Sequence, residues 1–117
     1  MYAIIDVIYG IPLTEEINDL INKWEADPNC DKWEEDEEHR MCGFEVMYSG
    51  HGGIPPGFCG VSLDQFDESN GHNSLINLKL EPTNDQKKKT LELINNLDRE
   101  IKDIILPVGI YLIWSTS

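Results

Sequence analysis

Apolar residues recur along the 117-residue chain with two periods, one typical of helices and one typical of strands. The helical period begins after Thr14, a residue type that often caps helix N-termini. One helix face then carries four apolar residues at the i, i+3, i+4, i+7 spacing: Ile17, Leu20, Ile21 and Trp24. This first helix should end before Pro28, because proline disfavours helical geometry in the residue that precedes it.

A second helix is predicted after Pro82. Thr83 and Gln86 have the spacing of a capping box, in which each side chain bonds a free backbone N–H at the start of the helix. The predicted helix ends at Leu106-Pro107. Its apolar stripe comprises Leu91, Ile94, Leu97, Ile101, Ile104 and Ile105.

Strand patterns fill most of the remaining chain. Residues 3–9 are almost continuously apolar and predict a strand buried on both faces, which ends at the turn residues Gly10-Ile11-Pro12. Residues 43–48, 58–63 and 75–80 alternate apolar and polar side chains, as one-sided strands do. Residues 108–114 are nearly all apolar and predict a central strand.

These elements predict one α/β (α+β) domain over residues 1–117, in the order strand, helix, two or three strands, helix, strand. Each helix has a single apolar stripe and therefore needs a sheet to cover. We expect a two-layer sandwich with a mixed sheet of four to five strands, in which the first and last strands are central.

The composition limits the classes of partner that the protein can bind. Twenty-two acidic and nine basic residues give a net charge of −13, which argues against direct nucleic-acid binding. The N-terminus lacks the basic region of a signal peptide, and no apolar run is long enough to span a membrane, so we expect a cytoplasmic protein. Three cysteines do not suggest a disulfide framework. A homo-oligomer is left open.

The stretch from Tyr48 to Val61 is rich in glycine, and the chain carries no charged residue between Val46 and Leu63. It matches neither nucleotide fingerprint that glycine-rich loops form. Glycines let backbone N–H groups approach an anion closely, although the same residues also build a compact turn. We therefore take six residues as candidate ligand contacts: Tyr48, Ser49, His51, Gly52, Gly53 and Phe58.

The only basic cluster is Lys87-Lys88-Lys89, near the start of the second predicted helix. A short run of solvated lysines is the simpler interpretation. Alternatively, Thr83 and the free N–H groups of the first turn attract a phosphate together with Lys87 and Lys88. A small anionic or nucleotide-type ligand between this helix and the glycine-rich loop is our leading hypothesis.

Six acids lie between Asp31 and Arg40, where we expect a solvated loop. A tryptophan among acids is also a plausible anchor for a partner protein. The alternative function is an inhibitor that mimics nucleic acid and occupies a basic surface of a host protein. Its candidate contacts are Trp33, Glu34, Glu35, Asp36, Glu37 and Glu38.

Metal binding and catalysis receive weaker support. Only His39 and Cys42 approach the paired spacing of zinc ligands, so we predict no metal and no cofactor. The enzymatic alternatives are a pair formed by Cys59 and His51, or metal-dependent hydrolysis through His51 with Asp64 or Asp67. The other cysteine and histidine residues of the middle third are Cys30 and His72.

The opening MYAIIDVIYG, the central GHGGIPPGFCGV and the closing GIYLIWSTS, in a short acidic chain, resemble small uncharacterised proteins of bacteriophages. The resemblance implies counter-defence or host takeover in the host-cell cytoplasm. Such proteins mask a host protein or sequester a signalling nucleotide. It points to a non-catalytic binding protein.

Overall fold

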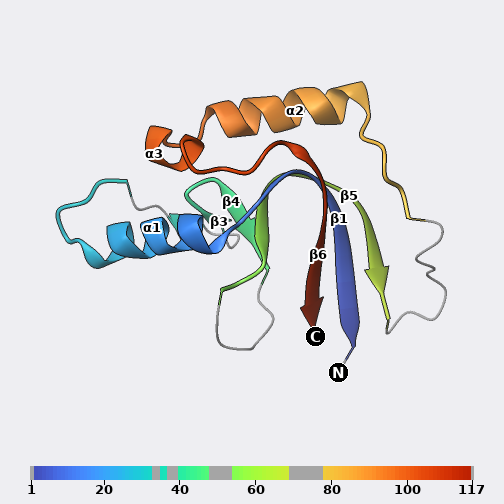
Figure 1. Ribbon diagram of the computed structural model, residues 1–117, viewed down its shortest axis with the longest axis horizontal. Helices are drawn as coiled ribbons and strands as arrows, with labels where there is room; N and C mark the ends of the chain where they lie inside the picture. Colours follow the sequence, from blue (N-terminus) through green and yellow to red (C-terminus); the bar gives the residue numbers. More distant parts are fainter. Residues whose placement is uncertain (1, 33–34, 37–39, 48–53, 69–77, 117) are drawn as a thin grey trace.

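The computed structural model describes residues 2–32, 35–36, 40–47, 54–68 and 78–116 (Figure 1). Two helices of twelve residues and one short helix pack with a sheet. The elements in chain order are β1 (Ala3–Pro12), α1 (Glu15–Ala26), β2 (Glu35–Asp36), β3 (Arg40–Met41), β4 (Phe44–Val46), β5 (Gly57–Asp67), α2 (Asn84–Asn95), α3 (Arg99–Lys102) and β6 (Gly109–Thr116).

The sheet has the strand order β2-β3-β4-β5-β1-β6, and every pairing between the described strands is antiparallel. The predicted α+β class, with two main helices on one sheet, is confirmed. The mixed sheet is wrong, because β3 and β4 form a tight hairpin and β5 returns beside both β4 and β1. Cys42 and Gly43 make the hairpin turn, and both have positive φ, as in a two-residue I′ turn.

The strand β1 lies between β5 and β6 as predicted, whereas the prediction that the last strand is central is wrong. β6 pairs with β1 along its whole length, from Ala3 opposite Thr116 to Gly10 opposite Gly109. Its other side is an edge of the described sheet. Apolar composition therefore marked a strand correctly but did not determine its position.

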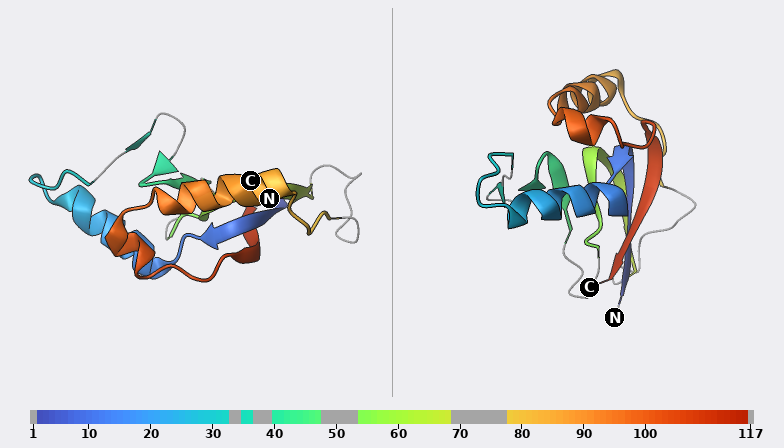
Figure 2. Two further views of the ribbon diagram at one scale, coloured as in Figure 1. Left: turned by 90° about the horizontal axis from the view of Figure 1, so that it is seen from above. Right: turned by 60° about the vertical axis from the view of Figure 1, so that its left-hand side comes forward.

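Both long strands bend at a row of glycines. Gly10 lies opposite Gly60 on one side and Gly109 on the other, and Gly10 and Gly60 have φ of 150° and 152°. A Cβ atom on either would overlap a backbone carbonyl oxygen of the other strand. β1 therefore continues through Gly10-Ile11-Pro12, which the sequence had predicted to be a turn. Figure 1 shows β1 and β5 arching beneath α2, and Figure 2 shows the arch from two other sides.

The first helix agrees with its prediction, with Thr14 accepting a hydrogen bond from the N–H of Ile17. The predicted capping box of Thr83 and Gln86 is also present. The second predicted helix is interrupted, however, because α2 ends at Asn95 and Asp98 caps the separate short helix α3. The apolar stripe continues across the break, since Leu97 and Ile101 are both buried, but its predicted first residue, Leu91, is 59% exposed.

Two further predictions need correction. Leu78–Leu80 belongs to no strand, while residues 75–77 of that predicted strand lie outside the described residues. The acidic stretch is not a loop throughout, because it contributes the two-residue strands β2 and β3. These two strands bring the sheet from the expected four or five strands to six.

The register assigns side chains to two faces of the sheet, because opposed residues point to the same side. On one face, which we call the helix-covered face, the three helices and the strands share a buried cluster of Ile11, Leu13, Ile17, Ile21, Trp24, Phe44, Val46, Cys59, Ile94, Leu97 and Ile101. The opposite face, which we call the Asp6 face, buries the smaller cluster of Ile8, Phe58 and Ile113. Asp6 lies on this second face, two residues before Ile8.

Candidate functional site

A cavity of about 290 Å³ lies on the Asp6 face. Arg40, Glu45 and Phe58 are opposed to one another across β3, β4 and β5, so their side chains share this face. Asp6 and Ser62 reach it from the two strands that pair beyond the glycine row. The complete lining is Asp6, Arg40, Glu45, Val46, Met47, Phe58 and Ser62.

Asp6 is the unusual residue of this cavity. Asp6 belongs to the central strand β1 and is only 6% exposed. One carboxyl oxygen, Oδ1, accepts a hydrogen bond of 3.0 Å from Nε2 of Gln65, whereas the buried Oδ2 has no partner among the described residues. Burial raises the pKa of Asp6 above its ordinary value of 3.8, and the Gln65 bond offsets only part of this effect.

A buried polar atom without a partner costs about 1–3 kcal/mol. Folded proteins therefore rarely keep one without a structural or functional reason. The position of Asp6 at a cavity gives such a reason, because a ligand that donates a hydrogen bond would remove the penalty. In the sequence, Asp6 is the one charged residue in the otherwise apolar run of residues 3–9.

The rest of the cavity combines apolar walls with a charged rim. Phe58 is buried in the small cluster, and Met47 packs against the same cluster. At the rim, Nη2 of Arg40 lies 3.3 Å from Oε1 of Glu45, and their side chains are 44% and 47% exposed. Ion pairs this exposed contribute at most about 1 kcal/mol. Arg40 can therefore exchange Glu45 for an anionic group at little cost.

A second cavity of about 340 Å³ adjoins the first, and the two share Arg40, Glu45 and Ser62. Its remaining lining comes from β5 and from one face of α2: Gly60, Val61, Gln86, Lys89 and Leu93. Residues three and seven positions apart lie on one side of a helix. Lys89 consequently faces β5, and its ammonium group is the second cation near the paired cavities.

Of the nine predicted ligand contacts, the structure places one at this site. Phe58 lines the first cavity. Thr83 caps α2 instead, while Lys87 and Lys88 are exposed and line neither cavity. Five predicted contacts lie outside the described residues: Tyr48, Ser49, His51, Gly52 and Gly53.

The glycine-rich loop nevertheless starts and ends beside the candidate site. The N–H of Met47 donates a 2.7 Å hydrogen bond to the carbonyl of Pro56, and this bond joins the two ends of the segment between them. Met47 lines the first cavity, and Phe58 follows Pro56 by two residues. The predicted loop and the observed cavity are therefore neighbours along the chain.

The prediction of a partner-binding acidic block stays a prediction. Trp33, Glu34, Glu37 and Glu38 lie outside the described residues. For Glu35 and Asp36 the structure describes only the backbone, which forms β2.

Most of the lining of the paired cavities was not among the ligand contacts predicted from the sequence, including Asp6, Arg40, Ser62 and Lys89. Arg40 was counted with the acidic stretch, and Ser62 carried no recognisable motif. Lys89 could have been distinguished from its two neighbours by its position three residues after the capping residue Gln86.

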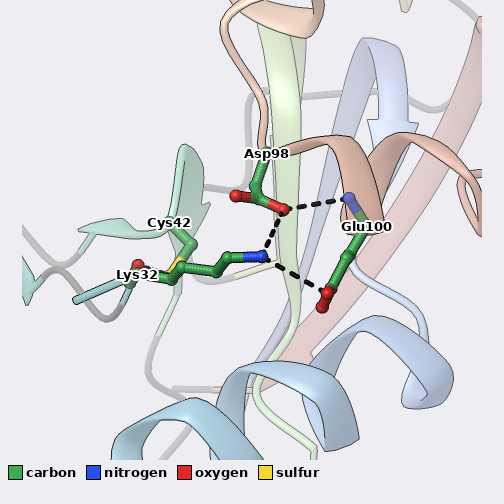
Figure 3. Close-up of polar contacts among 4 residues, drawn as sticks. All are labelled: Lys32, Cys42, Asp98 and Glu100. Carbon is green, nitrogen blue, oxygen red and sulfur yellow. Dashed lines mark hydrogen bonds and ion pairs between the residues drawn. The ribbon is translucent and has the colours of Figure 1, made fainter. Parts of the chain in front are cut away.

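A larger cavity of about 600 Å³ lies between the end of α1, the β3–β4 turn and the start of α3, and it shares Arg40 with both paired cavities and Leu93 with the second. Figure 3 shows its central contacts, in which Nζ of Lys32 lies 3.5 Å from Oδ1 of Asp98 and 3.3 Å from Oε1 of Glu100. The same ammonium lies 5.3 Å from the ring centroid of Trp24. The thiol of Cys42 donates to the carbonyl of Lys32 at 3.5 Å.

The contacts of Lys32 link three separate chain segments and leave its ammonium already paired. This arrangement holds elements together and offers less to a ligand than the unpartnered oxygen of Asp6. We therefore take the paired cavities on β5 as the candidate functional site.

The described side chains give little support to the enzymatic alternatives. Burial, with a smaller contribution from Glu45, raises the pKa of Cys59 to about 11, so this group is a thiol at neutral pH and a poor nucleophile. Backbone N–H groups of Lys79 and Gln65 bond Asp64 and lower its pKa. Among the described residues no group of three or more His, Cys, Asp or Glu side chains could hold a metal ion. His39, His51 and His72 lie outside them.

Comparisons with known proteins add no further constraint. No protein-family model matches the sequence, and no curated protein or solved structure matches it. None of the helices in the described part of the chain is long and apolar enough to cross a membrane.

Proposed function

We propose that the chain is a non-catalytic binding protein that sequesters a small nucleotide-type anion in the paired cavities on β5. The observation that carries the proposal is the buried Oδ2 of Asp6, which has no partner among the described residues and belongs to a residue that lines a cavity. A ligand that binds there must donate a hydrogen bond to a carboxylate.

The surroundings of Asp6 narrow the ligand further. The Phe58 ring and the Met47 side chain favour a flat apolar body beside the hydrogen-bond donor. Arg40 and Lys89 favour an anionic group next to it, and arginine in particular pairs well with phosphate. A nucleotide has all three parts: a base with N–H groups, a flat ring and a phosphate.

The two cavities suggest how these parts would divide. The base would occupy the cavity of Asp6 and Phe58, and the phosphate would occupy the adjoining cavity of Lys89. Arg40 and Ser62 border both and would contact the sugar or the phosphate. The resemblance to bacteriophage proteins suggests a role for such binding, namely removal of a signalling nucleotide from the host cytoplasm during counter-defence.

The first test measures nucleotide affinity by isothermal titration calorimetry with linear and cyclic mono- and dinucleotides. We expect Asp6→Asn to weaken binding of the best ligand at least tenfold, or about 1.4 kcal/mol, because the amide presents a donor where the ligand needs an acceptor. The exposed acid Asp19 on α1 provides the control, since Asp19→Asn makes the same chemical change elsewhere. Lack of binding by every nucleotide would refute the proposal.

The second test compares two adjacent lysines. Lys89→Gln should weaken nucleotide binding and reduce its salt dependence, because Lys89 faces the cavity. Lys88→Gln removes an equal charge from the neighbouring residue, which lines neither cavity, and should leave the affinity within twofold. An equal loss in both variants would show that general electrostatic attraction, and not the cavity, holds the ligand.

A further inference from the structure

The two edges of the described sheet differ in length and charge. At one edge, β2 has two residues, and both are acidic. At the other edge, β6 has eight residues and no charged side chain. Edge strands of monomeric proteins usually carry charge, proline or a bulge that prevents pairing with another chain. β6 has none of these devices, and its pairing with β1 is regular along its length.

β6 also presents an exposed apolar stripe. Ile110, Leu112 and Trp114 alternate along the strand and therefore point to one side, and they are 39%, 62% and 64% exposed. Their partners in β1 are Tyr9, Val7 and Ile5, which places the stripe on the helix-covered face, beside the part that the helices bury. Val108 extends the stripe by one more exposed residue.

The charge distribution selects the kind of partner. The chain has a net charge of −13, yet residues 104–117 include no charged side chain. A basic partner would find no acid on β6 to pair with. Two copies of this acidic chain, in contrast, can meet at β6 without placing like charges opposite each other.

We propose that β6 pairs antiparallel with β6 of a second copy about a two-fold axis at Leu112, so that the two sheets become continuous. In this register each Leu112 faces its counterpart, and each Ile110 faces the other copy's Trp114. Pairs of aromatic and β-branched side chains are favourable across antiparallel strands. The outward-facing N–H and C=O groups of the two β6 strands would also form hydrogen bonds with one another.

The exposed area indicates a reversible dimer. The four exposed side chains of the stripe offer on the order of 400 Å² of apolar surface per copy, or roughly 800 Å² in total, and the paired backbone adds to it. Stable interfaces bury at least about 1,000 Å². The contact is therefore near the lower limit, and we expect dissociation in the micromolar range.

Sedimentation velocity over a range of protein concentrations tests this inference. The wild-type chain should shift from monomer to dimer with rising concentration, whereas Leu112→Lys should remain a monomer because it places a charge at the two-fold axis. Leu91 gives a matched control, since this leucine is 59% exposed on α2, so Leu91→Lys should dimerise like the wild type. A wild-type chain that stays monomeric at every concentration, or dimerisation that survives in Leu112→Lys, would overturn the proposal.

A second measurement guards against misfolding of the lysine variant. In Leu112→Cys the two introduced thiols would face each other, because directly opposed Cβ atoms lie about 4.5–5.5 Å apart. Mild oxidation should then join two chains covalently, and the same change at Leu91 should not. Failure of Leu112→Cys to cross-link, with far-ultraviolet circular dichroism unchanged, would reject the proposed register. Nucleotide binding is independent of this interface, so the two proposals fail separately.

Discussion

The two faces of the sheet are formed by the same strands but differ in how many apolar residues they bury. The helix-covered face buries eleven apolar residues in one cluster, and all three helices contribute to it. Among the residues that the structure describes, the Asp6 face buries only three apolar residues in its cluster, and it also carries the buried carboxyl group of Asp6. Stability is therefore concentrated on one face, which allows the other to retain an unpartnered polar atom beside a cavity.

The largest loss of stability is expected at the glycine row, where the backbone carries both faces of the sheet. Gly10→Ala should prevent folding or lower the free energy of unfolding by at least about 4 kcal/mol, because positive φ and overlap with the Cys59 carbonyl act together. Gly109 belongs to the same row, but a Cβ there would only touch the Tyr111 ring at an ordinary contact distance of 3.8 Å, so Gly109→Ala should cost no more than about 1 kcal/mol. Urea unfolding measures both values, and equal losses would show that overlap at the bend is unimportant.

A substitution confined to the helix-covered face should cost stability but spare the ligand site. Phe44 is completely buried in the large cluster, and Phe44→Ala should lower the free energy of unfolding by about 3–4 kcal/mol. The exposed Leu91 serves as control, with a loss within about 0.5 kcal/mol for Leu91→Ala. Nucleotide affinity of folded Phe44→Ala should match the wild type. A parallel loss of affinity would mean that the two faces are coupled.

The smallest change in stability, and the only increase, should come from a substitution on the Asp6 face. Asp6→Asn should raise the free energy of unfolding by about 1 kcal/mol at neutral pH, because it removes a buried charge that lacks a full set of partners. The same variant weakens binding in our proposal. Stability gained together with affinity lost would mark Asp6 as a functional residue, whereas a less stable Asp6→Asn would identify it as a structural one.

The pH dependence of this gain has a definite sign. The pKa of Asp6 is raised in the folded protein, so the folded state retains the proton longer than the unfolded state. The wild type therefore loses stability from this group as the pH rises from about 3.8 through the folded-state pKa. The advantage of Asp6→Asn should grow over the same interval and then level off, which urea unfolding at several pH values can follow. An advantage that is the same at every pH would contradict ionisation as its cause.

Local signals in the sequence predicted where the two main helices begin. Thr14, Thr83 and Gln86 act through contacts within three residues, so their helices could be placed from the sequence alone. Features that depend on the whole fold could not. β6 was expected at the centre because its apolar composition reports burial preference, whereas its edge position depends on which strands remain to pair with it.

The candidate site shows the same difference between local sequence signals and features that depend on the whole fold. Asp6 was noticeable as a carboxylate within an apolar strand. Its burial and its hydrogen bond from Gln65, 59 residues away, however, depend on how the strands pair. Arg40 reaches the site because β3 and β4 align it with Glu45 and Phe58. Lys88 was expected at the ligand and Lys89 was not, since three consecutive lysines look alike until the helix turns one of them toward β5.

The glycine row has a consequence for how the candidate site could change over time. Phe58 and Ser62 line one cavity although they lie on either side of Gly60, and a straight strand would separate them by about 13 Å. The main chain, through Gly10 and Gly60, sets the curvature at this point. Side chains around the cavity are therefore free to vary in size and polarity while the backbone keeps its shape. A single bent scaffold of this kind could acquire a new ligand preference by a few substitutions, provided that both glycines are kept.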